Sequence, residues 1–256
     1  MLTPSALLAR LTDIGRSLER SGHALALIGL GSVGLELERL DAYSDLDFFA
    51  IVEDGYKSRY LDNLDWLSSL CPVAYHFRNT PDGYKLLFHD GIFCEFAVFE
   101  PGELSAMLFT HGRIIWKRPQ IEETIGAPTV RPASTPPPEA DWLVNEALTN
   151  LYVGLGRFRR GERLSAARFI QHYAVDRLVA LAATIEREGP APKDMFAPER
   201  RVERRFPDLA QALPHFIQGY EHSAESARAI LTFLEQHFTV NRALAEAIRE
   251  MADKAG

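Results

Sequence analysis

Two aspartates separated by one residue begin an apolar stretch, and their spacing suits metal chemistry. Asp45 and Asp47 flank Leu46 and lead into Phe48-Phe-Ala-Ile-Val52, a run typical of a buried β-strand. Side chains alternate between the two faces of a strand, so positions i and i+2 point to the same side. Two adjacent carboxylates repel each other, and Mg²⁺ is commonly held by one or two carboxylates together with substrate phosphates. For this pair alone, a solvent-exposed strand end is the simpler interpretation.

Two further features favour a metal site. Gly31-Ser32 follows the short apolar run 24–28, and a glycine turn after a strand presents N–H groups and a hydroxyl that bind phosphate. Glu95 interrupts the apolar run 92–99, where an acid is costly unless it is paired or binds a metal. A third carboxylate on a neighbouring strand would complete a two-metal site. The alternative for Glu95 is a side chain that faces solvent from an edge strand.

Together these motifs resemble the DNA polymerase β nucleotidyltransferase superfamily. The resemblance consists of Gly31-Ser32, twelve further residues, and Asp45-Leu-Asp47 before an apolar strand, with Ser44 directly ahead of the first acid. Over roughly residues 24 to 105 the chain is most similar to lincosamide and aminoglycoside nucleotidyltransferases. It departs from a common pattern after the Gly-Ser turn, where Val33 stands in place of a basic residue.

The resemblance implies a fold, a reaction and a set of site residues. It implies an α+β N-terminal domain in which Asp45, Asp47 and Glu95 bind two Mg²⁺ ions, while Gly31, Ser32 and Ser44 bind the nucleotide. The reaction would move a nucleoside monophosphate, expected to be AMP from ATP, to a hydroxyl of a small acceptor. An aminoglycoside, a lincosamide or an unrelated metabolite would all fit. Glu95 would be a metal ligand, or a general base within hydrogen-bond reach of that hydroxyl.

A competing motif overlies the same residues. Gly29-x-Gly31-x-x-Gly34 matches the dinucleotide fingerprint, and Asp54 lies near where a ribose-binding acid would stand, which would indicate an NAD-binding oxidoreductase. Against it, tight turns join three consecutive predicted strands, which implies antiparallel pairing. The oxidoreductase would also leave the three acids without a role. A third alternative is a non-catalytic nucleotide-binding or antitoxin-like module.

Composition limits the partners. The 256 residues are 46% hydrophobic and 25% charged with a net charge of -7, which is ordinary for a globular protein and argues mildly against nucleic-acid binding. The start of the sequence lacks a basic region followed by an apolar core, and no apolar run approaches the roughly 20 residues of a membrane span. We therefore expect a cytoplasmic protein with a small-molecule acceptor, no nucleic-acid partner and no membrane partner; homodimerisation is left open.

Hydrophobic periodicity and turn residues predict the order of elements. A helix begins after the N-cap Thr3 and ends at Gly22. Another helix is predicted over residues 56–69. The expected strands cover residues 24–28, 45–52, 73–78, 84–89, 92–99 and 113–117.

A change of composition predicts the domain organisation. The nucleotidyltransferase domain would cover residues 1–118, a proline-rich linker 119–138 and an all-helical domain 139–256. Expected helices in the last part cover residues 139–160, 165–187, 207–220, 223–237 and 241–254. Two arginine-rich runs, 157–163 and 200–205, are more often solvated helix faces than phosphate ligands. The predicted fold class is therefore α+β: a mixed sheet flanked by helices, followed by an all-helical domain.

Overall fold

The structure, a computed structural model, describes residues 2–130, 138–194 and 196–253. The chain divides into two compact units, Met1–Ser134 and Thr135–Gly256. Residues 131–137, which are part of the predicted proline-rich linker, lie outside the described residues. The exact bounds of the predicted domains stay a prediction.

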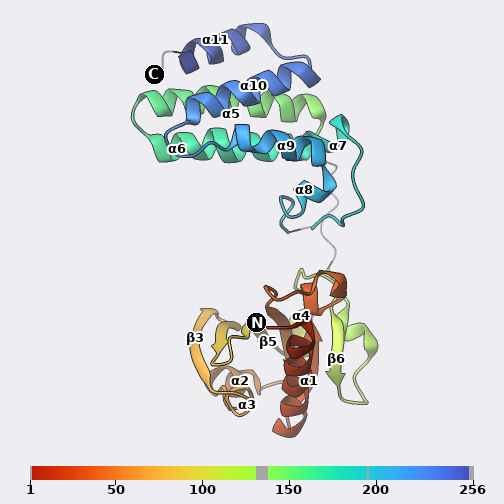
Figure 1. Cartoon of the computed structure of the whole chain (residues 1–256). Coiled ribbons are helices and arrows are strands. Elements are labelled where there is room, and N and C mark those ends of the chain that lie inside the picture. Colours follow the sequence, from red (N-terminus) through yellow and green to blue (C-terminus); the bar gives the residue numbers. More distant parts are fainter. Residues whose placement is uncertain (1, 131–137, 195, 254–256) are drawn as a thin grey trace. The chain divides into compact units, whose positions relative to one another are not determined.

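The first unit is built on a six-stranded mixed sheet in the order β3-β4-β5-β2-β1-β6, with β3 and β6 at opposite edges (Figure 1). Only β2 and β5 pair in parallel; the other neighbours are antiparallel. The strands are β1 (Ala24–Gly29), β2 (Leu46–Val52), β3 (Val73–Thr80), β4 (Gly83–Phe88), β5 (Phe93–Phe99) and β6 (Arg113–Lys117). The predicted mixed sheet and the two predicted hairpins are confirmed.

The strand directions contradict the dinucleotide-binding alternative. β1 is antiparallel to both of its neighbours, β2 and β6, whereas a dinucleotide-binding sheet needs parallel strands joined by a crossover. Steric crowding explains two of the three glycines. A methyl group at Gly29 would lie 2.7 Å from the carbonyl oxygen of Val33, and one at Gly34 would lie 2.8 Å from that of Gly29. The glycine spacing therefore reflects a tightly folded turn.

Helices cover one face of the sheet. Helix α1 (Pro4–Ser21) begins as predicted, with the Thr3 side chain accepting a hydrogen bond from the N–H of Ala6, and its C-cap is Gly22 with a φ of 92°. The buried side chains of α1 join the largest apolar cluster of this unit: Leu7, Leu11, Ile14 and Leu18. α1 thereby closes the core beneath the sheet.

The single helix predicted over residues 56–69 is wrong. Two short helices stand there, α2 (Lys57–Asp62) and α3 (Asp65–Ser68). Asn63 adopts an extended backbone at the end of α2, and its side-chain oxygen accepts a hydrogen bond from the N–H of Asp65 at 3.1 Å. Asn is prone to such local bonds, which compete with the helical ladder. Both helices still contribute to the core, through Tyr60, Leu61, Trp66 and Leu67.

A smaller apolar cluster forms on the opposite face, under the short helix α4 (Pro101–Leu104) and the 3₁₀ turn η3 (Glu123–Gly126). Its buried members are Leu25, Ala26, Ile28, Ile51, Phe99, Leu104 and Phe109. Ile121 and Ile125 pack against it, so the described beginning of the predicted linker lies on the first unit. The sheet is therefore covered on this face as well, at its β1–β2 side.

The second unit is helical, as predicted. Its elements are α5 (Ala140–Arg159), α6 (Arg163–Ala167), the π-helical η4 (Arg168–Ala174), α7 (Val175–Ile185), α8 (Val202–Arg205), α9 (Pro207–Phe216), α10 (Ser223–His237) and α11 (Arg242–Asp253). α5 contacts α7, α10 and α11 around one apolar core (Figure 1). The π-helical segment inside the predicted helix 165–187 and the short α8 were not predicted. Within the described residues, no helix has the length and apolar character to cross a membrane.

Candidate active site

Asp47 and Glu95 are direct neighbours across the parallel pair β2–β5. Both side chains are partly exposed, while the residues that flank them in each strand are buried. The register continues along the sheet, because Glu95 stands opposite Lys85 of β4 and Lys85 stands opposite Phe77 of β3. A row of charged side chains, Asp47, Glu95 and Lys85, therefore crosses one face of three adjacent strands.

Two residues from the β3–β4 hairpin contact the Glu95 carboxylate. The ammonium of Lys85 lies 3.1 Å from one carboxylate oxygen, and the amide of Asn79 donates to the other at 3.2 Å. Glu95 is thus held by a cation and a hydrogen-bond donor from the neighbouring hairpin. The sequence reasoning missed both residues. The predicted hairpin turn and strand alternation were the signals that could have found Lys85.

Asp45 lies outside the strand, at the residue before β2 begins. Because period-two alternation holds only inside a strand, the spacing does not fix its side chain beside that of Asp47. Among the described residues, no three or more His, Cys, Asp or Glu side chains group together in a way that would hold a metal ion. The structure therefore brings together Asp47 and Glu95, and the three-carboxylate site stays a prediction.

Ser44 takes part in the turn that leads into β2. Its hydroxyl donates to a carboxylate oxygen of Asp41 at 3.1 Å and accepts from the N–H of Asp41 at 3.0 Å. The same carboxylate accepts from the N–H of Tyr43. These bonds stabilise the turn that comes directly before Asp45. A contact of Ser44 with nucleotide stays a prediction.

The Gly-Ser turn abuts the Asp47 carboxylate. It forms a short 3₁₀ turn, η1 (Gly31–Val33), and the N–H of Leu30 donates to the carbonyl of Asp47 at 2.8 Å. Gly31 has a φ of +52°, and a methyl group there would lie 3.5 Å from a carboxylate oxygen of Asp47. Gly31 and Ser32 are both partly exposed. The turn and the Asp47 carboxylate are thus neighbours in space, and the binding of nucleotide by Gly31 and Ser32 stays a prediction.

Arg113 supports this turn from the edge strand β6. Its guanidinium donates to the carbonyl oxygens of Val33 at 2.9 Å and Gly34 at 3.1 Å. Burial lowers the pKa of Arg113, which nevertheless stays charged at any physiological pH. No pattern in the sequence indicates this contact, because residues about eighty positions apart meet only through the β1–β6 pairing.

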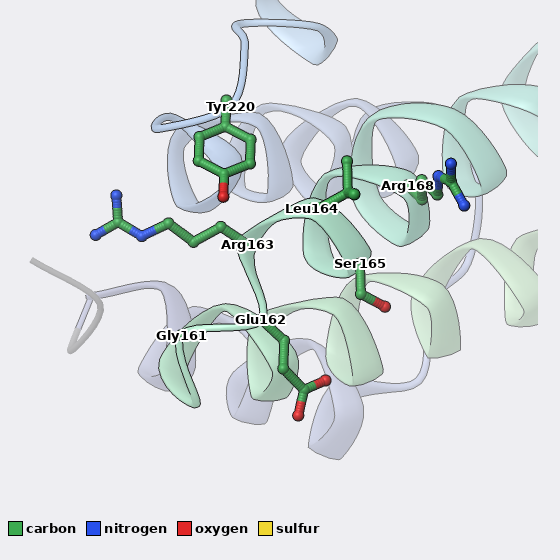
Figure 2. A pocket seen from close by; sticks show the side chains of 7 residues that line it. All are labelled: Gly161, Glu162, Arg163, Leu164, Ser165, Arg168 and Tyr220. Atoms are coloured by element: carbon green, nitrogen blue, oxygen red, sulfur yellow. The ribbon is translucent and has the colours of Figure 1, made fainter.

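The second unit contains a cleft of about 350 Å³ between the start of α6 and the loop before α10 (Figure 2). It is lined by Gly161, Glu162, Arg163, Leu164, Ser165, Arg168 and Tyr220. The guanidinium groups of Arg163 and Arg168 lie at opposite ends of this lining (Figure 2). Arg163 is paired with Glu221. The arginines therefore do not converge on a common ligand position.

The arginine-rich runs make local contacts. Arg157 stacks over the ring of Phe169 at 4.0 Å, and Arg160 pairs with Glu162 at 3.0 Å. In the second run, Arg205 is buried and pairs with Glu188 at 2.7 Å. These pairs anchor turns and helix ends within the second unit.

Comparison with known proteins gives structural neighbours only. No protein-family model matches the sequence, and no curated protein matches it. The chain is similar to an aminoglycoside 6-adenyltransferase from Bacillus subtilis, with 12% identity, 100% of this chain and 99% of that chain covered, and a TM-score of 0.38. It is also similar to a nucleotidyltransferase-like protein from Exiguobacterium sibiricum, with 14% identity and a TM-score of 0.31. That match covers 95% of this chain and 77% of the other.

A third similar structure is the CCA-adding enzyme of Thermotoga maritima complexed with tRNA, with 12% identity and a TM-score of 0.36. That match covers 99% of this chain and 73% of the other. At TM-scores this low, the similar structures support no inference about activity or substrate. Such an inference has to come from the residues of this chain.

Proposed function

We propose that the first unit binds a nucleoside triphosphate together with Mg²⁺ and transfers a nucleoside monophosphate to a hydroxyl of a small acceptor. One observation carries the proposal: Asp47 and Glu95 are register partners on adjacent strands, and the Gly31 turn lies against the Asp47 carboxylate. Paired acids beside a glycine turn combine what a metal-bound triphosphate requires, namely oxygen ligands for the cation and main-chain donors for the phosphates.

The donor chemistry of the site fits Mg²⁺. Asp47 and Glu95 offer hard carboxylate oxygens from adjacent strands, and Glu95 already attracts a cation, the ammonium of Lys85. Asp47 and Glu95 would hold the metal, with Asp45 contributing from the residue before β2. When bound, Mg²⁺ would neutralise phosphate charge and lower the pKa of a coordinated hydroxyl.

The protein's own residues would position the reactants. The N–H groups of Gly31 and Ser32, with the Ser32 hydroxyl, would bind the phosphates, while Arg113 keeps the turn in shape. Asn79 would orient the Glu95 carboxylate, which serves as a metal ligand or accepts the proton of the acceptor hydroxyl. Catalysis of this kind rests on positioning and electrostatics. We propose ATP as the nucleotide, with Ser44 among its contacts, and a small molecule, such as an antibiotic, as the acceptor.

Calorimetric titration tests the proposal. ATP is titrated with and without Mg²⁺ into the wild type, Asp47→Asn and Glu95→Gln. Asp13→Asn is the matched control, because Asp13 pairs with Arg16 of the same helix. We expect Mg²⁺-dependent binding in the wild type and the control, and weak or no binding in the two site variants. Equal binding by all four proteins would contradict the proposed site. NAD⁺ is titrated in the same way. NAD⁺ binding that needs no metal and is unchanged by the substitutions would overturn the proposed function.

A further inference from the structure

A guanidinium lies beside the Gly-Ser turn although the sequence has no basic residue within it. Arg39 ends the 3₁₀ turn η2 (Leu37–Arg39). A methyl group at Gly31 would lie 3.7 Å from Nη2 of Arg39 and 3.5 Å from a carboxylate oxygen of Asp47. The cation and the carboxylate therefore flank the same backbone position. The fold brings to this turn a positive charge that lies eight residues further along the chain.

The Arg39 guanidinium has unused donor capacity. Nη2 pairs with the carboxylate of Glu36, but Nε is buried and has no hydrogen-bond partner within the described part of the chain. The side chain is only 17% exposed, so the unpaired donor carries a desolvation cost. A ligand that brings several acceptor oxygens would relieve this cost, and guanidinium geometry matches phosphate oxygens in a bidentate way.

The other arginine at the turn does not have this capacity. Arg113 directs both Nε and Nη2 onto the carbonyl oxygens of Val33 and Gly34. Its donors shape the turn, and a phosphate contact would require those bonds to break. Of these two cations, Arg39 is the one positioned to bind a ligand.

We propose that Arg39 is the residue that binds the terminal phosphates of the nucleotide, across Gly31 from Asp47, and that Glu36 holds it in the nucleotide-free protein. The proposal rests on the proposed function and adds to it a specificity for polyphosphate. Because Glu36 and the phosphates compete for the same guanidinium, removal of the Glu36 charge should strengthen nucleotide binding. Loss of Arg39 should weaken ATP binding and leave AMP binding unchanged.

Titration of ATP and AMP in the presence of Mg²⁺ tests this, with melting temperatures measured in parallel. The variants are Arg39→Gln, Arg39→Lys and Glu36→Gln. Arg16→Gln is the matched control, because Arg16 also pairs with an acid three residues before it, Asp13. We expect Arg39→Gln to weaken ATP binding about ten- to a hundredfold, the range for lost hydrogen bonds to charged groups. Arg39→Lys should weaken it less, and Glu36→Gln should strengthen it.

The outcomes separate this inference from the proposed function. If the wild type binds ATP and Arg39→Gln binds it equally well, the role of Arg39 is wrong while the proposed function stands. If Arg39→Gln loses ATP and AMP binding in parallel and melts at a lower temperature, Arg39 is merely structural and the inference is also overturned. A wild type that binds no ATP with Mg²⁺ contradicts the proposed function itself.

Discussion

The two faces of the β2–β5 pair differ in chemistry although their residues alternate along the same strands. Toward α1, α2 and α3, the pair presents Phe48 and Phe96, stacked at 5.3 Å between ring centroids and almost fully buried. On the opposite face, the positions just before them in each strand are Asp47 and Glu95. One face thus stabilises the sheet, and the other gathers charge at one point of it.

The buried face of β2 and β5 can hold Asp47 and Glu95 side by side although the two carboxylates repel each other. A strand buried on one face cannot slip by one residue without moving its apolar side chains to the other face. The buried rings of Phe48 and Phe96, next to Asp47 and Glu95 in their strands, therefore fix the register that places the two acids side by side. Substitutions on the two faces should then affect different properties.

The largest expected effect is on the charged face. Asp47→Asn keeps the shape of the side chain but removes a charged metal ligand. We expect transfer activity, measured as pyrophosphate release with a responsive acceptor, to fall about 10³-fold or more, since metal stabilisation of the transition state amounts to several kcal/mol. The melting temperature should not fall. A loss of activity that merely follows unfolding would contradict the separation of the two faces.

The next effect is on the buried face. Phe96→Ala removes a ring that stacks on Phe48 and meets Trp66 edge-on. We expect the free energy of unfolding, measured by denaturant titration, to drop by about 3–5 kcal/mol. The folded fraction should still bind ATP with Mg²⁺. An unchanged stability would show that the aromatic stack is not what holds the register.

A smaller effect is expected at the turn. Gly34→Ala places a methyl group 2.8 Å from the carbonyl oxygen of Gly29, and such overpacking typically costs about 1–3 kcal/mol. Gly102→Ala is the matched control, because a methyl group there would meet none of the described residues within 4 Å beyond its own helix and chain neighbours. We expect lower stability and weaker ATP binding for Gly34→Ala only, as measured by thermal melting and calorimetry. Equal behaviour of the two variants would be evidence against a tightly packed turn.

The smallest effect on stability is expected at Lys85. The Lys85–Glu95 pair is 40% and 43% exposed, and pairs at such exposure contribute at most about 1 kcal/mol. Lys85→Gln should therefore barely change the free energy of unfolding. It should tighten Mg²⁺ binding in the presence of ATP, because a competing cation is removed from Glu95. Weaker metal binding in this variant would instead mean that Lys85 assists the metal site.

Local signals in the sequence were sufficient for much of the fold. The Thr3 cap, the Gly22 stop and the hairpin turns predicted element ends correctly, because they depend on residues close in sequence. The prediction of one helix over residues 56–69 was wrong because the Asn63 side chain accepts a hydrogen bond from the backbone. Hydrophobic periodicity does not reveal that such a bond competes with the helical ones.

The site was predictable only in part. Strand alternation and an acid in an apolar run pointed to Asp47 and Glu95, but their pairing depends on the parallel contact of β2 with β5, strands that are distant in sequence. Arg113 reaches the turn through another long-range pairing. The position of Arg39 depends on how η1 and η2 fold back on each other, which no local pattern specifies.

Electron paramagnetic resonance with Mn²⁺ in place of Mg²⁺ tests whether Asp47 and Glu95 share one metal ion. Free Mn²⁺ is measured with and without ATP for the wild type, Asp47→Asn and Glu95→Gln, with ATP-only samples to subtract Mn²⁺ held by the nucleotide alone. If they share it, the wild type binds Mn²⁺ in an ATP-dependent way and both variants lose this binding. Full Mn²⁺ binding by both variants would contradict it.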